Sequence, residues 1–377
     1  MALILVGLCW LPLVCAMPAA NGASRPQAGG AETACSLASR LEHWSDRRLA
    51  EQTIVVPVDA TSVSDVGVEV RSGVGGILLL GSSASPLFAE ALHQLVATAR
   101  GGVAPFVMLD EEGGAVERIP NLLGPIPSAR QVGATLNPAQ IRALAARLGA
   151  RLRSLGVTMD LAPVLDVDGG PGPDAQHPDG TRSFSADPAV AAADGVAFAT
   201  GLASSGVVPV VKHFPGLGGA SGNTDFAVAS TPPLVVLRRI GLVPFEAAIA
   251  ARLPAVMVSD AIVPGLSSIP ADLSPSVVEG LLRHTLGFHG LVVTDALSTP
   301  SIQAAGYTTA AASVAAIRAG SDLVLFASAR PRVASTTSAI VSSIVAAVTE
   351  HRLARSRLVR AVADTLIAKG QLPLCPT

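Results

Sequence analysis

Short apolar runs alternate with longer stretches of helical periodicity along almost the whole chain, and this alternation constrains the fold more than any other feature. Each run is too short for a helix and is rich in Val and Leu, which is typical of a buried strand. The longer stretches, at 86–100, 138–155, 187–204, 235–251 and 309–319, repeat apolar residues at helical spacing. The eight predicted strands are 53–56, 76–80, 106–109, 158–162, 207–211, 255–258, 291–294 and 323–326.

Regular alternation of strand and helix predicts a parallel sheet covered by helices. Eight such units favour closure into a single (β/α)8 TIM-type barrel, with an open doubly wound sheet as the alternative. No linker rich in Pro, Ser or charge follows residue 35, so we expect one domain over 35–375. The turn-rich segment 168–180 follows a strand and predicts a long loop on the active face.

The composition excludes several classes of function. Half of the 377 residues are hydrophobic and only 14% are charged, which permits a large core and excludes disorder. Lys and Arg total 26 against 28 Asp and Glu, so no excess of basic residues is present to bind nucleic acid. The sequence also contains no phosphate loop and no glycine-rich dinucleotide fingerprint after its first strand, and with four cysteines we expect neither an organic cofactor nor a metal.

The N-terminus differs from the rest of the chain. Residues 2–16 are almost unbroken apolar, small residues follow, and the first basic residue is Arg25. Such a run is too short to span a membrane and is typical of a secretory signal, so we assign 1–24 to a signal; a buried N-terminal helix is the alternative. We therefore expect an exported protein, extracellular or associated with the cell envelope.

The cysteines bear on the same question. Cys9 and Cys15 lie in the predicted signal, which leaves Cys35 and Cys375 at the two ends of the mature chain. Because exported proteins keep disulfides and barrel termini meet on one face, we expect a bridge between Cys35 and Cys375. In the alternative that the signal is a lipoprotein signal, a lipid on Cys15 would tether the protein to a membrane.

Polar residues gather where the predicted strands end. A single Asp after a strand is commonly a helix N-cap, but that explanation accounts poorly for several together. In a barrel the carboxyl ends of the strands converge on one mouth, where barrel enzymes hold their active sites. Carboxylates beside Lys, His and Arg suit a hydroxyl-rich ligand better than a zinc ion. The residues at the strand ends are Asp110, Glu111, Asp166, Lys212, His213, Asp260 and Asp295.

Five motifs occur in an order that resembles the family 3 glycoside hydrolases, and most closely their single-domain exported actinobacterial β-N-acetylglucosaminidases. The similarity covers nearly all of the mature chain, and the pairing of KHFPG with D-x-E-G-G-x-V-x-R is specific. The motifs are LDEEGGAVERIP (109–120), DLAPVLDV (160–167), GTRSF (180–184), VVKHFPGLGGASGNTD (210–225) and VVTDALS (292–298). The resemblance implies a barrel.

The resemblance also implies roles for individual residues. Asp295 matches the family's nucleophile, which in retaining enzymes attacks the anomeric carbon and forms a covalent glycosyl intermediate. A second set matches the sugar-binding residues: its carboxylate would accept hydrogen bonds from hydroxyls, its cations would donate them, and its His would donate from one ring nitrogen while the other is held. This set is Asp110, Arg118, Arg182, Lys212 and His213. Ion pairing within the mouth and a buried core position for the His are the structural alternatives.

The acid/base loop departs from the family. Relatives carry Asp-[Ser/Thr]-His, whose His protonates the leaving oxygen, whereas the same spacing here delivers Asn223, Thr224 and Asp225. Leu217 replaces another His of the motif, and Ala115 replaces an Arg. Asp260 occupies a position where many relatives have His.

Two hypotheses follow from this departure. In the first, Asp225 is the acid/base, with its pKa raised by burial or by Asp295, and Asn223 hydrogen-bonds it. The protein is then a retaining β-N-acetylglucosaminidase acting on terminal GlcNAc, and the resemblance implies GlcNAc–MurNAc fragments of the cell wall as its amino-sugar substrate. In the second, the protein is an impaired homologue that binds the sugar or a muropeptide. We expect a monomer that needs no metal or organic cofactor.

Overall fold

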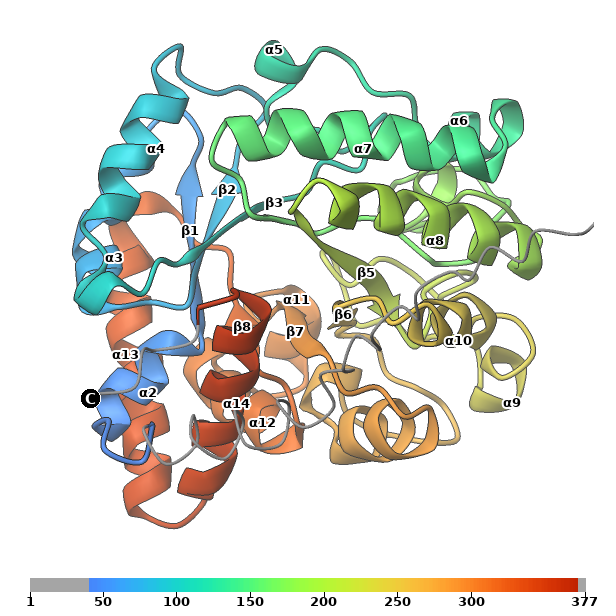
Figure 1. Cartoon of the computed structure of the whole chain (residues 1–377). Coiled ribbons are helices and arrows are strands. Elements are labelled where there is room, and N and C mark those ends of the chain that lie inside the picture. Colours follow the sequence, from blue (N-terminus) through green and yellow to red (C-terminus); the bar gives the residue numbers. More distant parts are fainter. Residues whose placement is uncertain (1–40, 372–377) are drawn as a thin grey trace, which may run out of the picture.

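A closed ring of eight parallel strands forms the centre of the protein in the computed structural model, which describes residues 41–371 (Figure 1). Each strand pairs with its neighbours in chain order, and β1 pairs with β8 to close the ring. The predicted (β/α)8 barrel is therefore confirmed. The strands are β1 (Ile54–Asp59), β2 (Gly76–Leu80), β3 (Phe106–Leu109), β4 (Met159–Asp160), β5 (Val208–Phe214), β6 (Ala255–Val258), β7 (Leu291–Ala296) and β8 (Leu323–Leu325).

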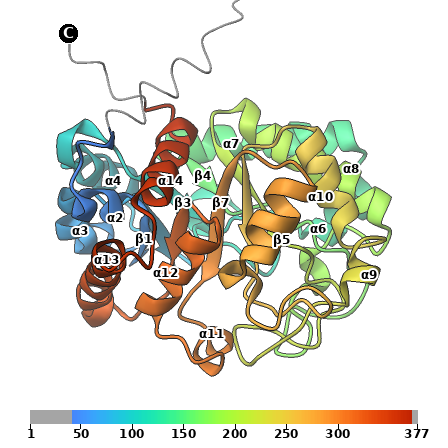
Figure 2. The ribbon, with the colours of Figure 1, turned by 90° about the horizontal axis from the view of Figure 1, so that it is seen from below.

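Helices form the outer layer, as Figures 1 and 2 show from two directions. Helices α7 and α8 pack side by side over one flank, while α2 packs against α13 and α14 on another. The helices are α2 (Asp46–Gln52), α3 (Gly67–Ser72), α4 (Phe88–Ala97), α5 (Pro120–Leu123), α6 (Ala129–Thr135), α7 (Pro138–Ser154), α8 (Pro188–Ser204), α9 (Leu234–Leu237), α10 (Leu242–Ala250), α11 (Pro300–Ala304), α12 (Thr309–Ala319), α13 (Val333–Thr349) and α14 (Arg355–Ala368). Short helical segments are η1 (Val63–Val66), η2 (Arg100–Gly102), η3 (Gly180–Arg182), η4 (Ala271–Leu273), η5 (Ser276–Thr285) and η6 (Arg330–Arg332).

The two long helices α7 and α8 each begin at an N-cap residue that the local sequence supplies. Asn137 caps α7 by accepting a hydrogen bond from the backbone N–H of Gln140, and Gln140 Oε1 in turn accepts a hydrogen bond from the backbone N–H of Asn137. Asp187 caps α8 by accepting hydrogen bonds from the backbone N–H groups of Ala189 and Val190 in the first turn of the helix. In both helices a proline follows the cap, where its missing N–H costs nothing. These signals explain why the boundaries of both helices agree with those predicted.

One predicted helix is wrong. The stretch 235–251 forms two helices, α9 and α10, separated by a turn that ends at Gly241. A Cβ on Gly241 would lie 2.7 Å from Leu237 Cδ2 and 3.2 Å from the carbonyl oxygen of Pro215. The chain therefore bends so that this glycine packs against the loop after β5, a tertiary contact that helical periodicity does not register.

The ends of β1, β4, β5, β7 and β8 also differ from the prediction, and in β5 and β7 the difference concerns charged residues of the predicted site. β5 continues to Phe214, so Lys212 and His213 lie within the strand rather than after it. β7 continues to Ala296 and so includes Asp295. Strands that carry charged side chains into a barrel mouth break the apolar pattern on which the prediction depended.

The interior of the barrel is filled by apolar side chains from every strand, which makes it a packed core below the polar mouth. One described helical segment, Arg330–Thr349, is long and apolar enough to cross a membrane by length and composition alone. Ile340, Ile344 and Val348 of this segment are buried in the core between helices and strands, as expected of a helix in a globular domain. The interior side chains include Val55, Leu78, Met108, Met159, Val210, Met257, Val293 and Leu325.

The predicted signal (1–24), Cys9, Cys15, Cys35 and Cys375 lie outside the described residues. The signal, the lipid on Cys15 and the bridge between Cys35 and Cys375 therefore stay predictions, as does the domain assignment 35–375.

Candidate active site

A cavity of about 290 Å³ opens at the carboxyl ends of the strands, and all eight predicted catalytic and sugar-binding residues line it. They come from β5, β7 and the loops after β3, β4 and β5. Pro173 and Pro178 also line the cavity, which places the predicted loop 168–180 on the active face as expected. The eight residues are Asp110, Arg118, Arg182, Lys212, His213, Asn223, Asp225 and Asp295.

A cluster of ion pairs forms one wall of the cavity. The buried ammonium of Lys212 lies 2.6 Å from Asp110 Oδ1 and 2.6 Å from Glu112 Oε1. Arg182 binds both carboxylate oxygens of Glu112 at 2.8 Å, and Arg118 Nη2 lies 3.4 Å from Asp110 Oδ2. Two carboxylates and three cations thus hold one another in fixed positions, which leaves the cluster with a net positive charge.

The charge state of this cluster follows from its contacts. Burial opposes the ionisation of both carboxylates, but the neighbouring cations outweigh it. Lys212 and Arg118 lower the pKa of Asp110, and Arg182 and Lys212 hold the pKa of Glu112 well below its ordinary value. Both groups are therefore carboxylates at neutral pH, with their remaining lone pairs available to accept hydrogen bonds from hydroxyl groups.

Glu112 is a site residue that the sequence analysis missed. The pattern of polar residues at the strand ends pointed instead to its neighbour Glu111, whose buried carboxylate does not line the cavity and accepts hydrogen bonds from the backbone N–H groups of Arg118 and Ile119. Side chains two positions apart in an extended segment point to the same side, so Asp110 and Glu112 belong together. The D-x-E spacing was the signal that could have identified Glu112.

His213 is held by the buried carboxylate of Asp166. Its Nδ1 lies 2.6 Å from Asp166 Oδ2, and Asp166 also accepts the backbone N–H groups of His213 and Leu217. Burial and the charge of Arg182 lower the pKa of His213 to about 4, so the ring is neutral at pH 7. Because Nδ1 carries the proton that is donated to Asp166, Nε2 presents a lone pair to the cavity 3.4 Å from Arg182 Nη2. His213, which we expected to donate a hydrogen bond to the sugar, therefore presents an acceptor, Nε2, to the cavity when its ring is neutral.

Asp166 and Asp179 form a second buried carboxyl pair behind the ring. Burial and the charge of Asp166 raise the pKa of Asp179 well above its ordinary value, so the pair shares a proton. Ligand atoms of Asp166, Asp179 and His213 lie within 4.8 Å of one another, close enough to hold a metal ion. The shared proton and the positive charge of Arg182 already balance these carboxylates, and we assign no metal to them.

Asp295 lies on the wall formed by β7. One of its oxygens accepts the backbone N–H of Ala296 at 2.7 Å, which fixes the carboxylate at the strand end. Burial raises the pKa of Asp295 to about 7, and the charges of Asp260 and Asp225 add to the effect. Asp260 is itself fully buried and accepts a hydrogen bond from the hydroxyl of Thr299. Asp295 is therefore a nucleophile candidate that gains its charge close to neutral pH.

The loop after β5 carries Asn223 and Asp225 to the rim. Asn223 Oδ1 accepts the backbone N–H of Asp225 at 3.0 Å, and its Nδ2 donates to the carbonyl oxygen of Asp174 at 3.2 Å. The expected hydrogen bond from Asn223 to the carboxyl of Asp225 is therefore replaced by bonds to the backbone, which fasten this loop to 168–180. Asp225 itself is exposed.

Comparisons with known proteins agree with this geometry. Residues 61–366 match the model of the glycosyl hydrolase family 3 N-terminal domain. The chain is 36% identical over 336 residues to the β-hexosaminidase LpqI of Mycobacterium tuberculosis, covering 87% of this chain and 83% of that protein.

Solved structures give the same result. A glycosyl hydrolase of family 3 from Mycobacterium smegmatis superposes with a TM-score of 0.78 at 35% identity, covering 88% of this chain and 98% of that one. A β-N-acetylhexosaminidase from Beutenbergia cavernae superposes with a TM-score of 0.77 at 34% identity, covering 87% and 99%.

Proposed function

Because the chain belongs to glycosyl hydrolase family 3 and is therefore a glycoside hydrolase, we propose that it is a retaining β-N-acetylglucosaminidase that removes terminal β-linked N-acetylglucosamine. The names of the similar proteins, β-hexosaminidase and β-N-acetylhexosaminidase, support an amino-sugar substrate. The observation that carries the proposal is the position of Asp295 on the same cavity as the ionic cluster of Asp110, Glu112 and Lys212. This arrangement supports a role for Asp295 as the nucleophile beside groups that are able to bind sugar hydroxyls.

The proposed reaction has two steps. The carboxylate of Asp295 attacks the anomeric carbon of the bound sugar while the carboxyl of Asp225 gives its proton to the leaving oxygen. In the second step Asp225 takes a proton from water, and the resulting hydroxide displaces Asp295 from the sugar. The ionic cluster holds the sugar hydroxyls throughout both steps. Each step forms one bond to the anomeric carbon and breaks one.

We further propose that the natural substrate is a GlcNAc–MurNAc fragment of the cell wall and that the protein acts after export. The resemblance to exported actinobacterial enzymes supports this, together with the apolar N-terminal run at 2–16. Release of N-acetylglucosamine from purified muropeptide fragments tests the substrate, and the mass of the mature N-terminus tests export and the lipid on Cys15.

A second candidate function is supported by a specific observation. Asp225 is exposed, and within residues 41–371 its carboxyl accepts no hydrogen bond that would hold it toward a leaving group. A protein with this loop could bind the sugar in an intact cavity and cleave it slowly. Saturable binding of N-acetylglucosamine without release of sugar from a muropeptide would favour this impaired homologue over the enzyme.

The nucleophile is tested by trapping the covalent intermediate. A fluorinated N-acetylglucosaminyl substrate that keeps the 2-acetamido group and has a good leaving group should label the protein, and peptide mapping should place the label on Asp295. The Asp295→Asn variant should neither label nor turn over an aryl β-N-acetylglucosaminide, whereas Glu246→Gln, a solvent-exposed carboxyl on α10, should do both. A label on any other carboxylate would remove Asp295 from this role.

The acid/base is tested by a pair of leaving groups. Asp225→Ala should lower the rate on a substrate with a poor leaving group by roughly 10² to 10⁴, because that oxygen then departs unprotonated. On an activated aryl substrate the first step survives, and azide should restore turnover because an anion needs no base, giving the β-glycosyl azide. Rates equal to those of Glu246→Ala with no effect of azide would exclude Asp225 from the mechanism.

A further inference from the structure

A cavity of about 490 Å³ lies at the amino ends of the strands, on the opposite end of the barrel from the active-site cavity. Its walls come from the starts of β3 and β5, from the residue before β4, and from the ends of α7 and α14. Because the active-site cavity opens at the carboxyl ends of the strands, the packed interior of the barrel separates the two spaces. A ligand in this cavity would therefore not contact the sugar site.

Two cationic side chains line this cavity, and no carboxylate does. Lys369, the residue after α14, places its Nζ 5.5 Å from the centre of the Phe106 ring and 3.3 Å from Gln52 Oε1. Arg153, near the end of α7, is exposed. Within residues 41–371 neither cation lies within ion-pair distance of a carboxylate. The described part of the chain thus supplies no anion to balance them.

The pKa of Lys369 reflects this imbalance. Burial lowers the pKa to about 7, because the ammonium group loses solvation and gains no carboxylate in return. The amine is therefore only about half charged at neutral pH. An anion placed beside it would favour the charged form and raise the pKa, so the binding of an anion and the uptake of a proton would be coupled.

The rest of the lining favours a ligand with an apolar body. Pro105, Phe106 and Val208 contribute apolar walls, and the first two are buried. A small inorganic anion would leave this surface uncovered, whereas an aliphatic chain would remove it from water. Small-molecule sites are commonly of this kind, mostly apolar with a few polar groups that fix the orientation of the ligand. The lining therefore matches an aliphatic carboxylate, with its charge at Lys369 and its chain along the apolar walls.

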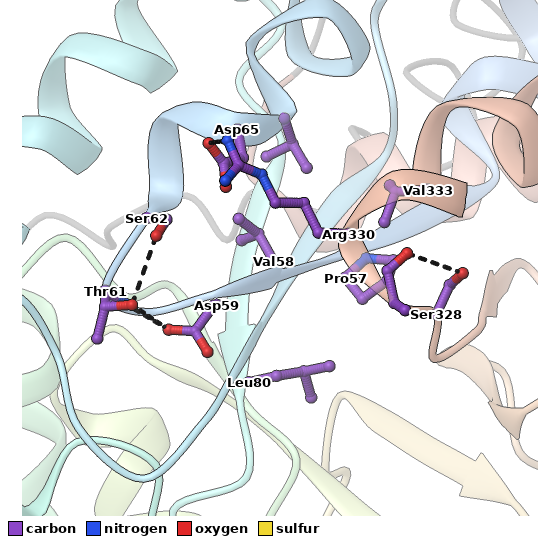
Figure 3. A pocket seen from close by; sticks show the side chains of 12 residues that line it. Pro57, Val58, Asp59, Thr61, Ser62, Asp65, Leu80, Ser328, Arg330 and Val333 are labelled. Atoms are coloured by element: carbon purple, nitrogen blue, oxygen red, sulfur yellow. Dashed lines mark hydrogen bonds and ion pairs between the residues drawn. The ribbon is translucent and has the colours of Figure 1, made fainter.

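A further cavity, of about 420 Å³ at the carboxyl ends of β1 and β8, lacks this imbalance (Figure 3). Its one cation, Arg330, lies 2.6 Å from Asp65 Oδ1. Asp59 accepts hydrogen bonds from the backbone N–H and the hydroxyl of Thr61, as Figure 3 shows for the hydroxyl. The charged side chains of that cavity already have partners, so it provides a matched control for the cavity at the amino ends.

We propose that the cavity at the amino ends of the strands is a binding site for an aliphatic carboxylate. Lys369 binds the carboxylate group, Arg153 adds to the positive potential that attracts it, and the apolar walls cover the chain. The site uses no residue of the active-site cavity and does not rest on the proposed function. Because the ligand binds only the folded protein, its binding also stabilises the fold.

Calorimetric titration of the full-length protein with sodium octanoate at pH 6 and at pH 8 tests the proposal. The carboxylate of octanoate is ionised at both pH values, whereas Lys369 loses its charge between them, so the dissociation constant should be about tenfold larger at pH 8. Titrations at pH 8 in buffers of different ionisation enthalpy should show the uptake of close to one proton for each octanoate bound. Octanol, which has the same chain without the charge, should show neither effect.

Three variants locate the site. Lys369→Met keeps the length of the side chain and removes its charge, so it should weaken octanoate binding at pH 6 by about tenfold or more and abolish the dependence on pH. Arg153→Met, a change at an exposed position, should weaken binding by a smaller factor and keep the dependence on pH. Arg330→Met removes an exposed arginine from the cavity of Figure 3 and should leave both the affinity and its pH dependence unchanged.

Any of three results would overturn the site. They are the absence of saturable octanoate binding at pH 6, binding of octanol as tight as that of octanoate, and titration of Lys369→Met that equals that of Arg330→Met. Saturable binding only by a variant that ends at Gln371 would also overturn it, because residues 372–377 would then be the occupant of the cavity in the full-length protein.

Discussion

Asp295 gains its negative charge in the presence of a second buried carboxylate, Asp260, and this relation determines the expected pH dependence. A nucleophilic carboxylate must be ionised, and burial together with Asp260 raises the pKa of Asp295 to about 7. Activity should therefore be lost as the pH falls through about 7. This loss forms the acidic limb of the profile of kcat/KM against pH, which reports the ionisation of the free enzyme. Asp260→Asn removes the like charge, so the limb should move to lower pH by about one unit.

The matched control for this shift is Asp194→Asn. Asp194 is a buried carboxyl on α8 whose pKa burial also raises, but it does not line the cavity. Profiles of kcat/KM against pH on an aryl substrate should superpose for the parent and Asp194→Asn. An acidic limb that stays in place in Asp260→Asn would show that Asp260 does not control the ionisation of Asp295.

Glu112 joins Lys212 to Arg182, and its removal should cost both stability and sugar binding. Glu112→Gln leaves two buried cations without their shared anion, and breaking such a pair typically costs about 3 kcal/mol in the free energy of unfolding. The lowered pKa of Glu112 stabilises the fold in full above the ordinary Glu value, and this contribution declines as the pH falls from that value toward the lower pKa of the folded protein. Urea denaturation should show a difference in the free energy of unfolding between parent and variant at pH 7, and this difference should narrow below about pH 4.

Glu246→Gln, a change at an exposed position, is the control for Glu112→Gln. Its free energy of unfolding should equal that of the parent at both pH 7 and pH 3. A difference of the same size between the parent and Glu112→Gln at pH 7 and pH 3 would mean that Glu112 contributes through packing rather than through its charge.

Residue identities at the site were largely predictable, whereas residue orientations were not. All eight predicted residues line one cavity because strand ends of a barrel converge. Which of Glu111 and Glu112 faces that cavity depends on how the chain turns after β3. Likewise the acceptor character of His213 Nε2 follows from Asp166 and Arg182, which meet the ring only in the folded protein.

At the scale of elements, the loop after β5 is positioned by one glycine. A Cβ on Gly218 would lie 2.0 Å from the carbonyl oxygen of Val167, far inside contact distance, whereas the nearest atom to a Cβ on Gly222 is 4.0 Å away. Gly218→Ala should therefore displace the loop that carries Asp225, lower kcat/KM at least tenfold, and destabilise the fold by about 1–3 kcal/mol. Gly222→Ala, in the same loop, should leave thermal stability near that of the parent. Equal behaviour of the two variants would show that the loop is free to move.

Strand prediction succeeded where burial alone determines an element. β2, β3 and β6 agree with their predicted bounds because each is an uninterrupted apolar run inside the barrel. The stretch 235–251 was predicted as one helix because its periodicity is continuous, but Gly241 packs against the loop after β5 and divides it. Such contacts join segments that are distant along the chain, so no local pattern contains them.

At the scale of the whole molecule, the first and last described helices are held together. Arg355 of α14 binds Asp46 at 2.7 Å and the carbonyl oxygens of Glu42 and Trp44 at 3.0 and 2.6 Å. Lys369 Nζ lies 3.3 Å from Gln52 Oε1. The two ends of the described chain therefore meet on one flank of the barrel, a consequence of closing the ring between β1 and β8.

This meeting of the ends supports the predicted bridge between Cys35 and Cys375, and a reducing agent tests it. A disulfide between these residues would close nearly the whole mature chain into one loop, and such a loop typically stabilises a protein by about 2–4 kcal/mol through the unfolded state. The exported protein should be two hydrogens lighter than its reduced form, and dithiothreitol should lower its melting temperature by several degrees. Cys35→Ser, Cys375→Ser and the double variant should each melt at the lowered temperature with or without the reductant, because all three lack the same bond. A parent whose melting temperature does not respond to dithiothreitol, or single variants that differ from the double variant, would exclude this pairing.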